Sequence, residues 1–123
     1  MLSVIVPASN EAGYIGACLS AIFASGPTKA EVIVVANGCR DATADVARSF
    51  EAQATAAGWR LRVLDLPQGG KPNALNAGDA LAQGDLRAYV DADVVVTPEL
   101  MAQLIAALAV PQPRYVAATP RIP

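Results

Sequence analysis

The 123-residue sequence contains no histidine, only two cysteines and few aromatic residues (5%). Without histidine, Ser-His-Asp and Cys-His nucleophile systems and histidine-ligated zinc sites are excluded. Cys18 and Cys39 form no C-x-x-C motif and predict no disulfide framework. Cys18 lies on an apolar helical stripe and is expected to be buried, whereas Cys39 falls in a predicted loop, where its thiol could react.

Long apolar runs and charged clusters are also lacking. The chain is 54% hydrophobic with mean hydropathy +0.37, but no stretch approaches the roughly 20 apolar residues of a membrane helix. We find no basic leader with a cleavage site and therefore expect a cytoplasmic protein without a transmembrane segment. The net charge is −2 and Lys and Arg are dispersed, which argues against a nucleic-acid partner. The length predicts one domain over residues 1–123.

Short apolar runs alternate with longer amphipathic stretches along the chain. The runs predict strands at residues 2–7, 32–35, 59–66, 86–90 and 115–119. The stretches between them predict helices after residue 10, over 41–57, over 72–82 and from 98 until Pro111 and Pro113. This alternation predicts an α/β fold with a mostly parallel, doubly wound, Rossmann-like sheet and helices on both faces.

Several helix signals are specific enough to be tested. Ser9 or Asn10 is expected to cap the first helix, and Thr97 with Pro98 is expected to open the last. The apolar stripe of the first helix has the spacing of one helix face and consists of Ile15, Cys18, Leu19, Ile22 and Phe23. The helix over 41–57 is expected to be continuous, with Val46, Phe50 and Ala54 at one-turn spacing and Gly58 as its stop.

Polar residues follow four of the predicted strands at their carboxyl ends, which face one crevice in parallel sheets. The sets are Pro7 to Glu11 after the first strand, Asn37 to Asp41 after the second, Gly69 to Lys71 after the third, and Asp91 and Asp93 after the fourth. Two carboxylates one residue apart face the same way if the backbone is extended. Such oxygens suit Mg²⁺ or Mn²⁺, which would in turn hold a diphosphate.

The other residues at this edge suit the same ligand. Lys71 would add a positive charge, the glycines would admit backbone N–H groups, and Asn37 or a backbone amide could read a nucleobase edge. Simpler interpretations stay open: Asn37-Gly38 as a plain turn, Lys71 as a solvated loop charge and Glu11 as a residue that favours its helix dipole. The simpler interpretations would all have to hold at the same edge of one sheet, which makes them less favoured together than each is alone.

The order of four motifs resembles family 2 glycosyltransferases of the GT-A fold. The motifs are residues 4–11 (VIVPASNE), 31–43 (EVIVVANGCRDAT), 70–78 (GKPNALNAG) and 89–93 (YVDAD). The resemblance implies a nucleotide-diphospho-sugar donor of the UDP or GDP type and inversion at the anomeric carbon. It implies that Asp93, with Asp91, binds Mn²⁺ or Mg²⁺, that Asp91 also lies on the ribose or sugar side, and that Asn37 contacts the base. The remaining donor-binding residues it implies are Pro7, Ala8, Asn10, Glu11, Gly38 and Lys71.

Two departures from the family pattern qualify this interpretation. Ala36 stands where many members carry an acid, which leaves the donor base less defined. In the family the second half supplies the acceptor surface and the base that inverting transfer needs. We therefore expect residues 1–123 to be the N-terminal donor-binding portion with the catalytic base absent, since Asp79 and Asp85 are weak candidates. An uncovered sheet edge would favour a homodimer.

Three other functions are alternatives to this interpretation. A non-catalytic nucleotide-binding or interaction module would bind a nucleoside diphosphate and transfer nothing. A sugar-phosphate nucleotidyltransferase would open with a glycine-rich loop and a basic residue, where this chain has Ala8-Ser9-Asn10-Glu11. A receiver-like domain would need an acidic pocket that Pro7-Ala8-Ser9 does not provide.

Overall fold

The computed structural model describes residues 1–27, 29–108 and 115–118. Its sheet has five parallel strands in the order β3-β2-β1-β4-β5. The strands are β1 (Leu2–Ala8), β2 (Ala30–Asn37), β3 (Trp59–Leu66), β4 (Leu86–Val90) and β5 (Tyr115–Ala118). The chain lays β2 and β3 to one side of β1 and returns to its other side with β4. This reversal opens a crevice at the carboxyl ends of β1 and β4, as in other open α/β sheets.

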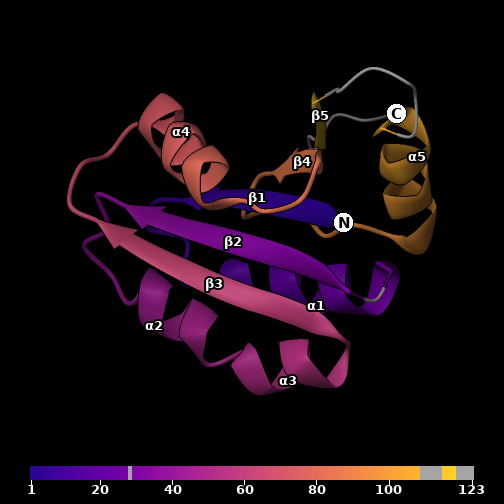
Figure 1. Cartoon of the computed structure of the whole chain (residues 1–123). Coiled ribbons are helices and arrows are strands. Elements are labelled where there is room, and N and C mark those ends of the chain that lie inside the picture. The colour runs from indigo at the N-terminus through magenta and orange to yellow at the C-terminus, as the bar shows by residue number, and fades with distance from the viewer. Residues whose placement is uncertain (28, 109–114, 119–123) are drawn as a thin grey trace.

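Helices cover both faces of this sheet (Figure 1). They are α1 (Ile15–Ser25), α2 (Thr43–Arg48), α3 (Glu51–Ala56), α4 (Lys71–Leu81) and α5 (Pro98–Leu108). Helices α1, α2 and α3 lie on one face and α4 lies on the other, while α5 contacts α1, β4 and β5. The predicted doubly wound α/β fold is therefore confirmed. Among the described residues, none of these helices has both the length and the apolar character to cross a membrane.

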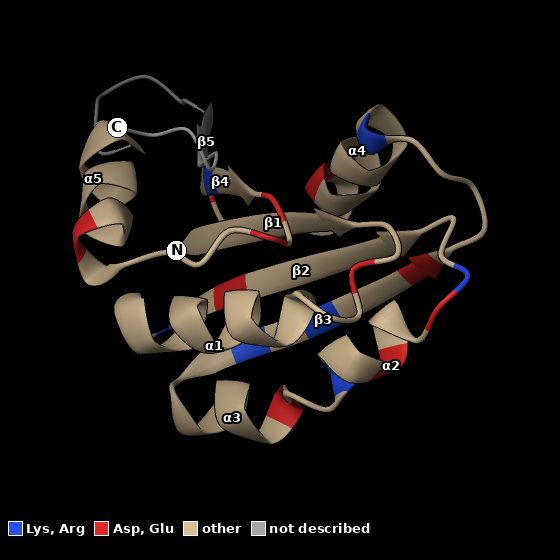
Figure 2. Cartoon of the chain, turned by 180° about the vertical axis from the view of Figure 1, so that it is seen from behind, with Lys and Arg blue, Asp and Glu red and all other residues tan. Residues whose placement is uncertain are grey.

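The core consists of two layers separated by the sheet. The larger lies between the sheet and α1, α2, α3 and α5, and the smaller lies under α4. Every residue of β2 is buried, and its continuous β-branched run is typical of a strand covered on both faces. Helix α1 carries no charged residue and lies between its neighbouring helices (Figure 2). Its buried residues are the predicted stripe of Ile15, Cys18, Leu19, Ile22 and Phe23.

Two helix predictions are wrong. Neither Ser9 nor Asn10 caps α1: the helix begins at Ile15, after a turn in which the Tyr14 N–H donates to the Glu11 carbonyl. The predicted continuous helix over 41–57 is two short helices that break at Ser49 and Phe50. There the Ser49 N–H is shared between the Asp45 and Val46 carbonyls. The next N–H, of Phe50, donates to the Ala47 carbonyl three residues back. The Ser49 hydroxyl donates to the Val46 oxygen at 2.5 Å. Serine competes in this way with the ordinary helical ladder.

The other boundaries agree closely with the predictions. Strands β3 and β4 match residue for residue, and α4 begins at Lys71, one residue before the predicted start. Gly58 follows α3 with φ +78°, which is the left-handed conformation of a helix stop. The Thr97 hydroxyl accepts the Leu100 N–H at 3.1 Å, so the predicted cap of α5 is confirmed. The predictions at Pro111, Pro113 and Thr119 lie outside the described residues.

A buried carboxylate ties three segments together at the amino end of the sheet, away from the crevice. Glu31 of β2 is 1% exposed. Its Oε2 accepts hydrogen bonds from the Ser3 hydroxyl at 2.6 Å and from the backbone N–H groups of Gln83 at 2.6 Å and Gly84 at 3.3 Å. Its Oε1 lies 3.8 Å from Arg62 Nη1. This cluster joins β1 and β2 to the loop that leads into β4.

Candidate functional site

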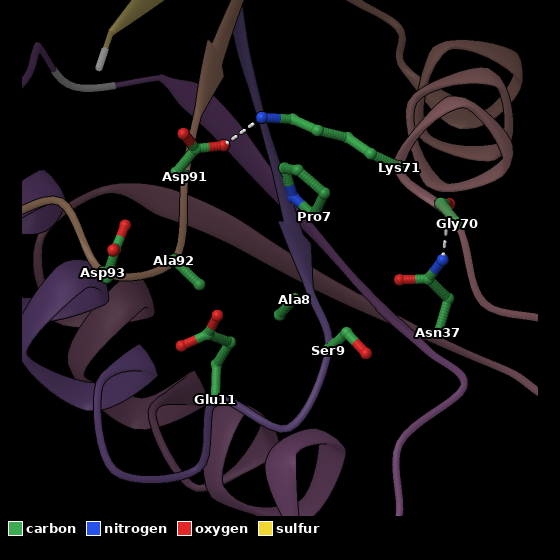
Figure 3. A pocket seen from close by; sticks show the side chains of 10 residues that line it. All are labelled: Pro7, Ala8, Ser9, Glu11, Asn37, Gly70, Lys71, Asp91, Ala92 and Asp93. Carbon is green, nitrogen blue, oxygen red and sulfur yellow. Dashed lines mark hydrogen bonds and ion pairs between the residues drawn. The ribbon is translucent and has the colours of Figure 1, made fainter. Parts of the chain in front are cut away.

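A pocket of about 290 Å³ lies where the carboxyl ends of β1, β2 and β4 meet the amino end of α4 (Figure 3). It is lined by Pro7, Ala8, Ser9, Glu11, Asn37, Gly70, Lys71, Asp91, Ala92 and Asp93. Seven of the predicted donor-binding and metal-binding residues are in this set: Pro7, Ala8, Glu11, Asn37, Lys71, Asp91 and Asp93. The sheet therefore brings together residues that are up to 86 positions apart in the sequence (Pro7 to Asp93).

The Asp91-x-Asp93 pair lies in a turn beyond the strand. Strand β4 ends at Val90, and the Val94 N–H donates to the Asp91 carbonyl at 3.0 Å. The backbone is thus not extended, which was the condition under which we expected the two side chains to point the same way. Both carboxylates nevertheless line the same pocket (Figure 3).

Glu11 adds a third carboxylate on the opposite side of the pocket (Figure 3). The pKa of Glu11 is raised, first by burial and then by the negative charges of Asp93, Asp41 and Asp91. Mutual repulsion of this kind shows that the pocket concentrates negative charge, which a bound cation would relieve. Among the described residues, no three His, Cys, Asp or Glu side chains converge closely enough to form a complete metal site. A metal bound by these acids would complete its coordination with other ligands, such as water or substrate oxygens.

Lys71 is the basic residue of the pocket. It begins α4, and its Nζ lies 2.6 Å from Asp91 Oδ1. The residue before it, Gly70, has φ +99°, which L-residues with a side chain rarely adopt. The ion pair spans the pocket mouth between α4 and β4, and both side chains retain access to solvent. Lys71 is therefore placed where it can contact an anionic ligand bound beside Asp91.

Asn37 ends β2 and is 2% exposed. Its Nδ2 donates to the Gly70 carbonyl at 2.8 Å, so one half of the amide is occupied by the protein itself. The side chain lines the pocket, with Oδ1 directed away from Gly70 (Figure 3). Asn37 thus joins the β2–α2 loop to the start of α4.

Asn10 and Gly38 are the two predicted donor-binding residues that are not among the pocket-lining residues. Asn10 has φ +55°, and its Oδ1 accepts the Arg40 N–H at 2.7 Å. Gly38 has φ +63° and donates its N–H to the Leu66 carbonyl at 2.9 Å. Both residues hold neighbouring loops against each other around the pocket.

Three pocket-lining residues are not among the predicted donor-binding residues: Ser9, Gly70 and Ala92. Ser9 and Gly70 belong to the sets predicted to gather at this edge, and Ala92 lies between the two aspartates, so each lies inside a motif already identified. Thr43 is the last residue of the motif over 31–43, but no role was predicted for it. It is buried at the start of α2, and its Oγ1 accepts the Glu11 N–H at 3.0 Å. It thereby holds the backbone of the pocket's third acid.

The cysteines and the weak base candidates lie where they take no direct part in the pocket lining. Cys18 is buried, as predicted, and burial raises the pKa of its thiol to about 12. Cys39 is half-buried, and both thiols are free. Asp79 accepts hydrogen bonds from Arg87 and Tyr89, and Asp85 pairs with the amino terminus at the amino end of β4.

Comparison with known proteins gives a consistent set of matches. The model of the family described as "Glycosyl transferase family 2" matches residues 3–122. Glycosyltransferase AglE of Haloferax volcanii is 36% identical over 94 residues, covering 75% of this chain and 30% of AglE. The curated relatives are much longer, since this chain spans 25% to 34% of their lengths.

Two solved structures carry nucleotide sugars. The mannosyltransferase PcManGT from Pyrobaculum calidifontis, in complex with GDP-Man and Mn²⁺, has a TM-score of 0.79 and 31% identity, covering 89% of this chain and 32% of its own. S. aureus TarS (residues 1–349), in complex with UDP-GlcNAc, has a TM-score of 0.69 and 26% identity, covering 87% of this chain and 30% of its own.

Proposed function

Because this chain belongs to glycosyltransferase family 2, on a family match over residues 3–122, we propose that it is the donor-binding portion of an inverting, metal-dependent glycosyltransferase. The donor would be a nucleoside-diphospho-sugar of the UDP or GDP type, as in the two related structures. The observation that carries the proposal is the pocket itself, in which Glu11, Asp91 and Asp93 face Lys71 at the crevice of the sheet.

The residues present fit a divalent cation. Asp91 and Asp93 offer carboxylate oxygens, which hard cations such as Mn²⁺ and Mg²⁺ prefer, and the charge repulsion at Glu11 favours a cation nearby. Asp93, with Asp91, would hold the ion. Mg²⁺ sites commonly use one or two carboxylates together with substrate phosphates, which agrees with two acids rather than a complete protein cage. When bound, the ion would neutralise the diphosphate leaving group.

The remaining lining residues would bind and orient the donor. Lys71 would add positive charge beside the diphosphate from the side opposite Glu11. Pro7 and Ala8, at the end of β1, form the floor between the two acidic loops (Figure 3). Asn10 and Gly38 would support donor binding indirectly, because their hydrogen bonds hold the loops around the pocket.

Transfer to an acceptor requires a base in line with the anomeric carbon. Glu11, Asp91 and Asp93 are the carboxylates that line the pocket among the described residues, and our proposal places them against the metal and donor. Asp79 is committed to Arg87 and Tyr89, and Asp85 to the amino terminus. We therefore expect residues 1–123 to bind a donor without transferring its sugar.

Calorimetric titration with UDP, GDP and dTDP, each with and without Mn²⁺, tests this function. We expect Mn²⁺-dependent binding of at least one nucleotide and at least about a tenfold loss of affinity in Asp93→Asn. Asp45→Asn is the matched control, because Asp45 is an exposed carboxylate on α2. Failure of the folded protein to bind any of the three nucleotides, or equal binding by wild type and Asp93→Asn, would contradict the proposal.

A further inference from the structure

The loop between β3 and α4 is pinned at two points to the residues that end β2. Asn37 Nδ2 donates to the Gly70 carbonyl at 2.8 Å, and the Gly38 N–H donates to the Leu66 carbonyl at 2.9 Å. Gly38 also approaches the end of the loop closely, since a Cβ on Gly38 would lie 2.9 Å from Gly69 Cα. The Asn37-Gly38 turn therefore holds both the beginning and the end of the loop.

The end of this loop decides where Lys71 begins. Lys71 follows Gly70 directly and starts α4, from which it reaches Asp91 at 2.6 Å. The Lys71 side chain is 57% exposed, and exposed ion pairs contribute little to holding a long side chain in place. The hydrogen bond to the Gly70 carbonyl comes from the buried Asn37 side chain and is the firmer constraint on the lysine.

The orientation of the Asn37 amide is fixed by its partner. A backbone carbonyl only accepts hydrogen bonds, so Nδ2 must face Gly70. The NH₂ group of the Asn37 side chain therefore forms a hydrogen bond within the protein, whereas its oxygen does not bind Gly70. The Gly70 carbonyl also accepts the Ala74 N–H at 3.2 Å in the first turn of α4, so the Asn37 contact reaches the helix itself.

We propose that Asn37 is a positioning residue: its amide donor fixes Gly70 and, through it, Lys71 beside the diphosphate. For its effect on ligand binding, this inference rests on the proposed function. It assigns the positioning to the N–H donor and leaves Oδ1, which faces away from Gly70 (Figure 3), available to a ligand. Removal of the donor alone should then weaken binding even where an acceptor oxygen is kept.

Two variants separate these roles. Asn37→Asp keeps the shape and an acceptor oxygen but lacks the donor, whereas Asn37→Ala lacks both. Positioning predicts that each weakens Mn²⁺-dependent nucleoside diphosphate binding about tenfold. Gln53→Ala serves as the control, because it removes an amide that contacts Ser20 away from the pocket. Wild-type affinity in Asn37→Asp or in Asn37→Ala would overturn the proposal.

A double-mutant cycle with Lys71→Met tests whether Asn37 acts through the lysine. If it does, Asn37→Ala should cost little further affinity once Lys71 is gone, whereas independent roles would give additive losses. A purely structural defect would also lower affinity in the Lys71→Met background, so additive losses count against positioning.

Hydrogen–deuterium exchange of the nucleotide-free protein keeps the inference testable whether or not nucleotides bind. We expect faster exchange in Asn37→Ala confined to residues 67–74, with the rest of the sheet unchanged and no such effect in Gln53→Ala. Unchanged exchange in this segment would refute the anchor. Absence of nucleotide binding by wild type, with the exchange effect present, would instead refute the proposed function and leave the anchor as the established part.

Discussion

Neutralising Glu31 should make the protein less stable at neutral pH and less sensitive to acid. Burial by itself disfavours the ionised form of Glu31, but hydrogen bonds from Ser3, Gln83 and Gly84 and the charge of Arg62 outweigh it and lower its pKa. The carboxylate is therefore an ionised group that the fold stabilises at the amino end of the sheet. Glu31→Gln keeps the shape and removes the charge.

The size of the effect follows from the contacts. The two short hydrogen bonds, from the Ser3 hydroxyl and the Gln83 N–H, are each 2.6 Å long. A hydrogen bond to a charged group contributes about 1.5–3 kcal/mol and a neutral one about 0.5–1.5 kcal/mol, so two bonds lose about 2 kcal/mol in Glu31→Gln. Glu31→Ala should lose more, about 3–5 kcal/mol, because the donors and Arg62 are left without their partner.

The pH dependence has a definite sign. Because the pKa of Glu31 is lower in the folded protein than in the unfolded chain, the unfolded chain binds the proton first as the pH falls. The contribution of Glu31 is therefore complete above its ordinary pKa of 4.5 and is lost as the pH falls through the folded value. The difference between wild type and Glu31→Gln should shrink over this range.

Urea denaturation followed by circular dichroism, at several values from about pH 7 to about pH 3.5, measures this difference directly. Asp45→Asn controls for the loss of one exposed acidic charge. The reasoning would be refuted if Glu31→Gln matched wild type at neutral pH. It would also be refuted if the difference between the two proteins stayed constant down to the lowest pH.

Two further predictions concern packing and thiol access. Gly78→Ala places a Cβ 2.5 Å from Ile5 Cγ2, so overpacking of about 1–3 kcal/mol should exceed the roughly 1 kcal/mol gained in helix propensity. Denaturation should show net destabilisation, and a stabilised variant would mean that α4 can shift without cost. Because Cys18 is buried with its pKa raised to about 12, a thiol reagent should label one cysteine quickly in the native protein and two in denaturant. Cys39→Ser should abolish the fast reaction, and two fast thiols in native wild type would contradict this assignment.

The sequence by itself determined most of the strands and the choice of fold. Strands β3 and β4 were predicted residue for residue, because each is a short apolar or alternating run bounded by turn residues such as Gly58. Such apolar or alternating runs are local patterns, and they predict a strand wherever one face of the sheet is buried. Helix breaks were less readable, since the competing hydrogen bonds of Ser49 act within a stretch whose periodicity still favours one helix.

The set of residues at the site also followed largely from the sequence. Parallel strands direct their carboxyl ends to one edge, so residues after each strand had to gather there. What they contact was decided only by the tertiary structure. The pairing of Lys71 with Asp91 and of Asn37 with Gly70 depends on strand order, on the turn after β4 and on the positive φ at Gly70.

Glu31 shows the same division at the opposite end of the sheet. Its position before an apolar run gives no local sign of burial, and its partners Gln83 and Gly84 are more than 50 residues away. The register of β1 against β2 places Ser3 opposite Glu31, and the loop before β4 supplies the N–H donors. Local sequence patterns therefore determined the helices and strands. The roles of individual polar side chains were set by distant segments that meet only in the folded sheet. The reason is that a hydrogen bond depends on the spatial position of its partner and not on its distance along the chain.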